Sequence, residues 1–306
     1  MSIIILGIHD KVLKEGFDMI RVVGSVRRLV KRPDIVLAFS LSTFVFCFTE
    51  YILVFPVLYG ISSISGGNLM DNIMHVIQLI IGLFLNPRYL LYGLAGALFA
   101  GLAFGFVSSG CFYMLNNFLA KRKKIQLEFF KGVKKHFIKL SIVSFTLVLL
   151  SILFCVFMMV VSVPAVAVTR SFLDGRTDLL VLTVLFDIVT LLVLFFGFMF
   201  FRIYMFSWFP AVLNFTDRHF SIGKYAADTY FWNILVRIML LDVVFILFEY
   251  IMIYFNSILP IDGAASILRV VLLLFINWIF KTLFFITLTV MIFTRFLAFK
   301  EKVSQE

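Results

Sequence analysis

Charged residues are scarce in this chain. Asp, Glu, Lys and Arg together make up 14% of its 306 residues, whereas soluble domains average about 25%. Hydrophobic residues make up 62% of the sequence, against about 45–50% in soluble domains. So much apolar surface excludes a soluble globular domain and predicts a protein embedded in lipid.

Residues that build metal sites and catalytic centres are few and scattered. The chain has three cysteines and four histidines: Cys47, Cys111, Cys155, His9, His75, His136 and His219. No CxxC pair, Cys/His spacing or HExxH motif is present, and the cysteines fall in apolar runs, where each is predicted to be a small buried hydrophobe. A GxSxG motif, a P-loop and a dinucleotide-binding glycine pattern are also missing. We therefore expect no cofactor, no metal and no intrinsic catalysis, and a lipid-active enzyme is the least favoured class.

Strand patterns, low-complexity tracts and a soluble domain are absent as well. A cleavable signal peptide is not expected, because the apolar stretch Met1–Ile8 is short and its basic residues follow it. Six other apolar runs reach the roughly 20 residues that a membrane-spanning helix needs. They are Asp34–Tyr59, Tyr89–Leu119, Leu140–Val168, Leu179–Phe206, Phe231–Leu259 and Ala264–Phe296, and all six prolines lie near their expected ends. The sequence predicts an all-α polytopic membrane helix bundle with six transmembrane helices.

Amphipathic stretches beside the spans are expected to form interfacial helices. Lys11–Lys31 and Ile125–Lys139 alternate basic and apolar residues at helical spacing, which predicts helices on the inner leaflet. Asn72–Leu85 is apolar but too short to span, so it is expected at the outer interface or as a re-entrant helix. The expected domains are a cytoplasmic amphipathic N-terminal segment (1–33), a six-span membrane domain (34–299) and a short cytoplasmic tail (300–306).

The 27 Lys and Arg residues gather in alternate connectors. Twenty fall in the segments on one side of the six-span arrangement and four on the other, while Arg202, Arg237 and Lys281 fall within spans. Because basic residues mark cytoplasmic segments, both termini are expected inside, in a plasma or inner membrane. The net charge of +10 then fits a lipid bilayer with anionic inner-leaflet lipids as the partner, and nucleic acid is not expected.

A stripe of small residues runs along the second span, with members four residues apart. They are Gly93, Ala97, Gly101, Gly105 and Ser109. Small residues let helices approach closely where lipid provides no hydrophobic drive for association. The stripe therefore predicts a helix–helix contact. Packing within one bundle is favoured over a homo-oligomer seam or a sliding surface, and a homo-oligomer or protein partner is left open.

Ionisable residues inside spans are rare and costly, so each is a candidate site. Counted at 1.5 Å per residue, Glu50, Asp187 and Glu249 all lie roughly 12–13 Å from the outer helix ends. One interpretation is a cluster that binds a cation or proton. The other, which is favoured, gives each carboxylate its own neighbours.

Asp242 and Lys281 share a deeper position, roughly 24 Å from the outer ends of the last two spans. Consecutive antiparallel helices place equal depths side by side, so an Asp242–Lys281 ion pair is predicted. Such a pair either fixes helix register, the favoured interpretation, or acts as a gate or proton-coupled element. Without it, Glu50, Asp187 or Glu249 is the next candidate counter-ion for Lys281.

The region around the fifth span resembles a known family. The segments Arg202–Asn214 (RIYMFSWFPAVLN) and Ser221–Asn233 (SIGKYAADTYFWN) precede an apolar helix, and Phe130–Phe137 (FKGVKKHF) is similarly placed before the third span. This layout resembles six-span prokaryotic proteins related to the membrane domain of glycerophosphodiester phosphodiesterases. Those proteins typically have a short helix with an Ala-x-x-Ser element at this point, where this chain has Ala227 and Tyr230. The resemblance implies the six-span fold but no phosphodiesterase activity, because that enzyme needs a soluble barrel domain.

Two functions remain in view. A transport or permeation component is favoured, because charged residues lie inside the bundle. The alternative is a non-transporting membrane partner such as a scaffold, an immunity factor or a complex subunit. A hydrated cavity reaching the carboxylates would favour the first, and a dry bundle with paired charges would favour the second.

Overall fold

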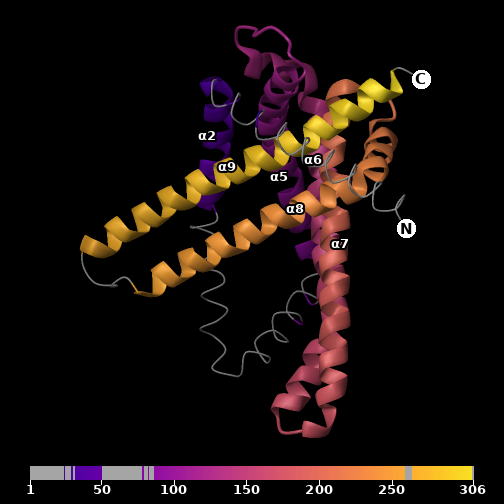
Figure 1. Cartoon of the computed structure of the whole chain (residues 1–306), viewed down its shortest axis with the longest axis vertical. Coiled ribbons are helices and arrows are strands. Elements are labelled where there is room, and N and C mark those ends of the chain that lie inside the picture. Colours follow the sequence, from indigo (N-terminus) through magenta and orange to yellow (C-terminus); the bar gives the residue numbers. More distant parts are fainter. Residues whose placement is uncertain are drawn as a thin grey trace, which may run out of the picture. The chain divides into compact units, whose positions relative to one another are not determined.

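The described part of the chain consists of helices and short connectors, without strands, in the computed structural model (Figure 1). The structure describes residues 32–49, 86–258 and 264–304 together with residues 24, 29, 78 and 82, and only the backbone of residues 49, 253, 255–258 and 264–270. The α-helices are α2 (Pro33–Thr49), α5 (Pro87–Leu119), α6 (Glu128–Leu173), α7 (Leu180–Asn214), α8 (His219–Ile258) and α9 (Ala264–Val303), with a 3-10 turn, η2 (Thr177–Leu179), before α7. Two compact units are present, and their boundaries fall inside α5, α6 and α7.

Four of the described helices are long and apolar enough to cross a membrane. They cover Pro87–Leu119, Glu128–Leu173, Thr177–Asn214 and Val271–Val303, and Pro33–Phe48 is a shorter apolar helix. A bilayer core about 30 Å thick needs about 20 helical residues. The chain is therefore an integral membrane protein. Several expected features lie outside the described residues. They are Lys11–Lys31 (apart from Gly24 and Leu29), Glu50 with the rest of the first expected span up to Tyr59, and Asn72–Leu85 (apart from residues 78 and 82).

Helix α6 is longer than the span expected over Leu140–Val168. From Glu128 on, the expected interfacial stretch Ile125–Lys139 is the first part of the same helix, so the prediction of a separate helix there is wrong. Glu128–Lys139 has no proline to end the helix. Pro164 also lies inside α6 rather than near its end. A membrane helix tolerates this because neighbouring groups satisfy the backbone atoms that proline frees.

Helix α8 contains a break. Tyr230 has φ −113° and ψ 15°, which is not helical, so His219–Thr229 and the apolar part from Phe231 are two helical segments joined at one residue. The first segment lies in the region of the short helix implied by the resemblance, and the break falls next to the expected start of the fifth span.

The first unit comprises Met1–Thr49, Ser108–Lys135 and Phe206–Glu306, and its core is aromatic. Phe112 on α5 contacts rings from three other helices, with centroid distances of 6.1 Å to Phe39, 5.0 Å to Phe209 and 5.4 Å to Phe293. Phe39 and Phe293 are at most 1% exposed. These contacts draw α2, α5, α7 and α9 together at one point.

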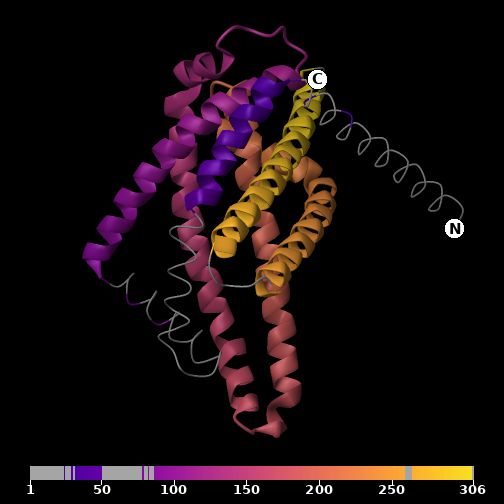
Figure 2. The same ribbon diagram turned by 90° about the vertical axis from the view of Figure 1, so that its left-hand side faces the viewer.

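Polar groups join α2 to α9 in the same unit. The indole Nε1 of Trp278 donates to the carbonyl of Ser40 at 2.8 Å, and the hydroxyls of Thr43 and Thr282 share a hydrogen bond. Trp278, which the sequence places in the middle of a span, therefore has its polar atom satisfied inside the bundle. The two helices lie side by side in both views (Figures 1 and 2).

The second unit comprises Glu50–Val107 and His136–Met205, and close contacts hold α5, α6 and α7. A Cβ on Gly101 would lie 2.7 Å from the Cα of Phe145, and one on Gly105 would lie 2.5 Å from the Cα of Ser141. Phe154 on α6 stacks on Phe201 of α7 at 4.7 Å. The two glycines thus lie directly against the backbone of α6.

The remaining members of the small-residue stripe differ in their surroundings. Ala97 is 3% exposed and Ser109 is fully buried, but a Cβ on Gly93 would have nothing within 4 Å. The cysteines differ too. Cys47 and Cys111 are buried, whereas Cys155 is exposed on α6, so the expectation that it is buried is wrong. A thiol is apolar enough to lie on a lipid-facing surface.

Candidate intramembrane charged site

The register between α8 and α9 is set by phenylalanines. Phe248 stacks on Phe280 with ring centroids 3.6 Å apart, and Phe245 contacts Phe280 and Phe284 at 6.1 and 4.9 Å. Residue numbers rise along α8 as they fall along α9, so the two helices run antiparallel, and they lie side by side in Figures 1 and 2. Any charged residue next to these rings is held at a defined depth.

Glu249 and Lys281 form an ion pair within this register. The Nζ of Lys281 lies 3.4 Å from the Oε1 of Glu249, and the two side chains are 12% and 34% exposed respectively. Charge-assisted hydrogen bonds are shorter, about 2.7–2.9 Å, and Glu249 Oε1 has no hydrogen-bond partner in the described part of the chain. Lys281 also lies over the ring of Phe245, 5.9 Å from its centroid. The pair compensates charge without closing a hydrogen bond.

The depth count that made Asp242 level with Lys281 needs correction. The aromatic contacts bring Lys281 opposite Glu249, which lies seven residues, or about 10 Å, further along α8. The count assumed that the last residues of α8 and the first residues of α9 lie at the same depth. In the observed register, the first residues of α9 extend past the end of α8. Contact between Asp242 and Lys281 stays a prediction, and Glu249 was the alternative counter-ion.

The other expected carboxylates have separate settings. Asp187 on α7 accepts hydrogen bonds from the Oγ1 of Thr169 on α6, at 3.0 Å to Oδ1 and 3.2 Å to Oδ2. Glu50 lies outside the described residues, and Asp187 and Glu249 belong to different units. A cluster of all three carboxylates stays a prediction.

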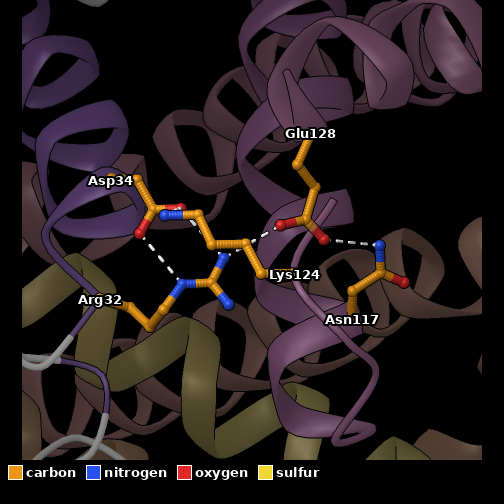
Figure 3. A network of polar contacts seen from close by, with 5 residues as sticks. All are labelled: Arg32, Asp34, Asn117, Lys124 and Glu128. Atoms are coloured by element: carbon orange, nitrogen blue, oxygen red, sulfur yellow. Dashed lines mark hydrogen bonds and ion pairs between the residues drawn. The ribbon is translucent and has the colours of Figure 1, made fainter. Parts of the chain in front are cut away.

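A second polar network, which the sequence did not suggest, lies where α2 begins. The guanidinium of Arg32 donates to Asp34 and to Glu128, each at 3.0 Å, and Asn117 Nδ2 donates to Glu128 Oε1 at 2.8 Å (Figure 3). Lys124 lies 3.4 Å from Asp34. The Glu128 side chain is 3% exposed, so this carboxylate links Arg32 to Asn117 on α5 from a buried position.

The acidic members of this network favour the charged form of Arg32. The hydrogen bond and charge of Asp34, followed by those of Glu128, raise the pKa of Arg32 above its ordinary value against the opposing effect of burial. A signal was available in the sequence, because Glu128 is the only acidic residue among eight basic ones in Ala120–Lys139. Since its partners come from distant positions, the network is best explained as a structural tie.

Among the described residues, no group of three His, Cys, Asp or Glu side chains could hold a metal ion. Comparison with protein families, curated proteins and solved structures finds no match to this chain. The site must therefore be interpreted from its own geometry.

Proposed function

We propose that this integral membrane protein is a six-span transport or permeation component of a plasma or inner membrane, with both termini in the cytoplasm. The observation that supports transport is the Glu249–Lys281 ion pair between the apolar parts of α8 and α9. The bias of basic residues supports the topology, and the described helices supply at least four of the spans.

An intramembrane ion pair stabilises the contact of two helices poorly, because both charges must first lose their hydration. Replacing a buried pair with apolar residues of similar size is often neutral or stabilising, and the stacked rings of Phe248 and Phe280 already hold α8 against α9. A charged pair in this position is therefore a functional-site hypothesis by default. The Glu249 side chain is 34% exposed, although its Oε1, which faces Lys281, is buried.

The geometry supports a simple mode of action. A cation or proton that binds Glu249 must compete with the Lys281 ammonium for the same oxygen. The looseness of the 3.4 Å pair makes this competition easier than in a tight bidentate bridge. Binding and release at Glu249 would thus alternate with pairing to Lys281.

Flux measurements on the purified full-length protein in liposomes test this proposal. Wild-type vesicles are expected to pass protons or monovalent cations faster than protein-free vesicles, and Glu249→Gln should reduce the flux to the protein-free rate. Asp178→Asn is the matched control, because Asp178 is an exposed carboxylate in the turn before α7. Wild-type vesicles without flux for either class of ion would overturn the proposal.

A non-transporting membrane partner is the second candidate. It is favoured by the fact that Glu249 and Asp187 both have partners, which is the arrangement expected of a static bundle. In that case wild-type protein passes no ions, and the pair contributes only to stability. The same flux assay therefore separates the two functions.

Anionic inner-leaflet lipids are the proposed partner of the basic connector. Lys121, Lys123, Lys131, Lys134 and Lys135 are all exposed, and none of them makes an ion pair with another described residue. Each basic residue near an anionic surface contributes about 1 kcal/mol to the attraction. This contact would hold the cytoplasmic ends of α5 and α6 at the headgroups.

A further inference from the structure

Two buried acceptor atoms, one on α8 and one on α9, lack a hydrogen bond within the described part of the chain. They are the Oε1 of Glu249 and the Oδ1 of Asn277. Asn277 is only 7% exposed. Buried polar atoms nearly always have a partner, and those that do not often mark the place of a bound water or ion.

Helix geometry places Asn277 on the same side of α9 as Lys281. The two residues are one turn apart, a spacing that stacks side chains on one face. Phe280 and Lys281 both contact α8, through Phe248 and Glu249. Trp278 and Thr282 lie on a different side and contact α2. Asn277 therefore belongs to the α8 side, one turn from the ion pair.

We propose that Glu249, Asn277 and Lys281 hold a water molecule that exchanges protons with the Glu249 carboxylate. One water donates two hydrogen bonds and accepts others. It would donate to Glu249 Oε1 and Asn277 Oδ1 and accept from Lys281 Nζ. Three polar partners are what a buried water typically has, and this arrangement satisfies both acceptors at once.

The proton is the species that this site handles, and its role in moving protons rests on the proposed transport function. A proton delivered through the water binds the carboxylate, and the water remains neutral. The net charge of the pair changes from zero to +1, because Lys281 stays cationic. Asp242, two turns away on α8, offsets part of that charge. Helix α2 also packs against α9. The only charged residue in its described part is Asp34, at its first turn.

Infrared difference spectroscopy of the full-length protein in nanodiscs, recorded between two pH values in ordinary and 18O water, tests the site. The expected spectrum has a protonated-carboxyl band that Glu249→Gln removes. It also has a water O–H band that shifts in 18O water and is lost in Asn277→Leu. Asp187→Asn is the control and should keep both bands, because Thr169 binds that carboxylate in the other unit.

The site is overturned if the carboxyl band persists in Glu249→Gln or if the water band persists in Asn277→Leu. Should Asn277→Leu fail to fold, Asn277→Gln displaces the same oxygen by one methylene and must shift the water band, and an unchanged band is again contrary. Proton flux in liposomes separates this inference from the proposed function. Both bands without flux support the site and overturn transport, whereas flux without either band overturns the site and supports transport.

Discussion

At the scale of single residues, the chain uses its few charges in pairs and short networks. Lys281 lies beside Glu249 within the apolar part of the bundle, and Arg32 lies between Asp34 and Glu128 at the start of α2. The two sites differ in closeness. Arg32 makes hydrogen bonds of 3.0 Å to both carboxylates, while the Lys281 pair is looser. The first is a structural tie, and the second is the pair on which the proposed function rests.

Lys281→Met should destabilise the protein, because it leaves the Glu249 charge without its partner. Breaking a fully buried pair costs about 3–5 kcal/mol, and the cost here should be smaller because Glu249 is 34% exposed. Adding Glu249→Gln to Lys281→Met should recover much of the loss in thermal unfolding of the purified protein. Adding Asp242→Asn instead should recover less. A larger recovery with Asp242→Asn would support the Asp242–Lys281 pair and contradict Glu249 as the main partner of Lys281.

At the scale of the elements, glycine decides how closely α5 approaches α6. A side chain on Gly101 would meet the backbone of Phe145 at 2.7 Å, closer than real Cβ contacts. A flexible side chain could move aside, but backbone on a packed helix cannot. The small-residue stripe therefore permits the close contact with α6 at Gly101 and Gly105, whereas Gly93 has open space around it.

Gly101→Leu should lower the stability or yield of the protein more than Gly93→Leu. Overpacking a closed contact typically costs about 1–3 kcal/mol, and a backbone clash belongs at the upper end. Gly93→Leu is the matched control, because it makes the same change in the same helix without a neighbour within 4 Å. Equal thermal unfolding midpoints for the two variants would contradict the close contact of α5 with α6.

At the scale of the whole molecule, topology decides which ends of the helices meet the cytoplasm. The bias of basic residues predicts that both termini, the α5–α6 connector and the start of α8 lie inside. The apolar helices of the described part require a membrane but do not by themselves give its sidedness. Charge distribution and labelling must supply it.

A cysteine introduced at Ser171, near the end of α6, should react with an impermeant maleimide from outside intact cells. One at Ser221, in the first segment of α8, should react only after permeabilisation. The background should carry Cys155→Ala, because Cys155 is exposed whereas Cys47 and Cys111 are buried. Labelling of Ser221→Cys from outside and of Ser171→Cys only after permeabilisation would reverse the topology.

The sequence by itself determined the class of protein and the approximate course of its helices. Length and hydropathy are enough for this, because a lipid core demands long apolar helices whatever their neighbours. The stripe of small residues also pointed to a close contact before any partner was known, since only small side chains permit one.

Only the tertiary structure decided which side chains meet. Counting residues gives the position of a side chain along its helix. It gives neither the rotation of the helix about its axis nor the offset of the helix relative to its neighbour. Equal depth therefore suggested Asp242 as the partner of Lys281, a contact that stays a prediction, and left Glu249 as an alternative. The stacking of Phe248 on Phe280 brings Glu249 beside Lys281. Glu128 stands out in the sequence as a lone acidic residue, but its contact with Arg32, 96 residues away, does not. Long-range contacts depend on how helices pack and leave no periodic signal in the chain.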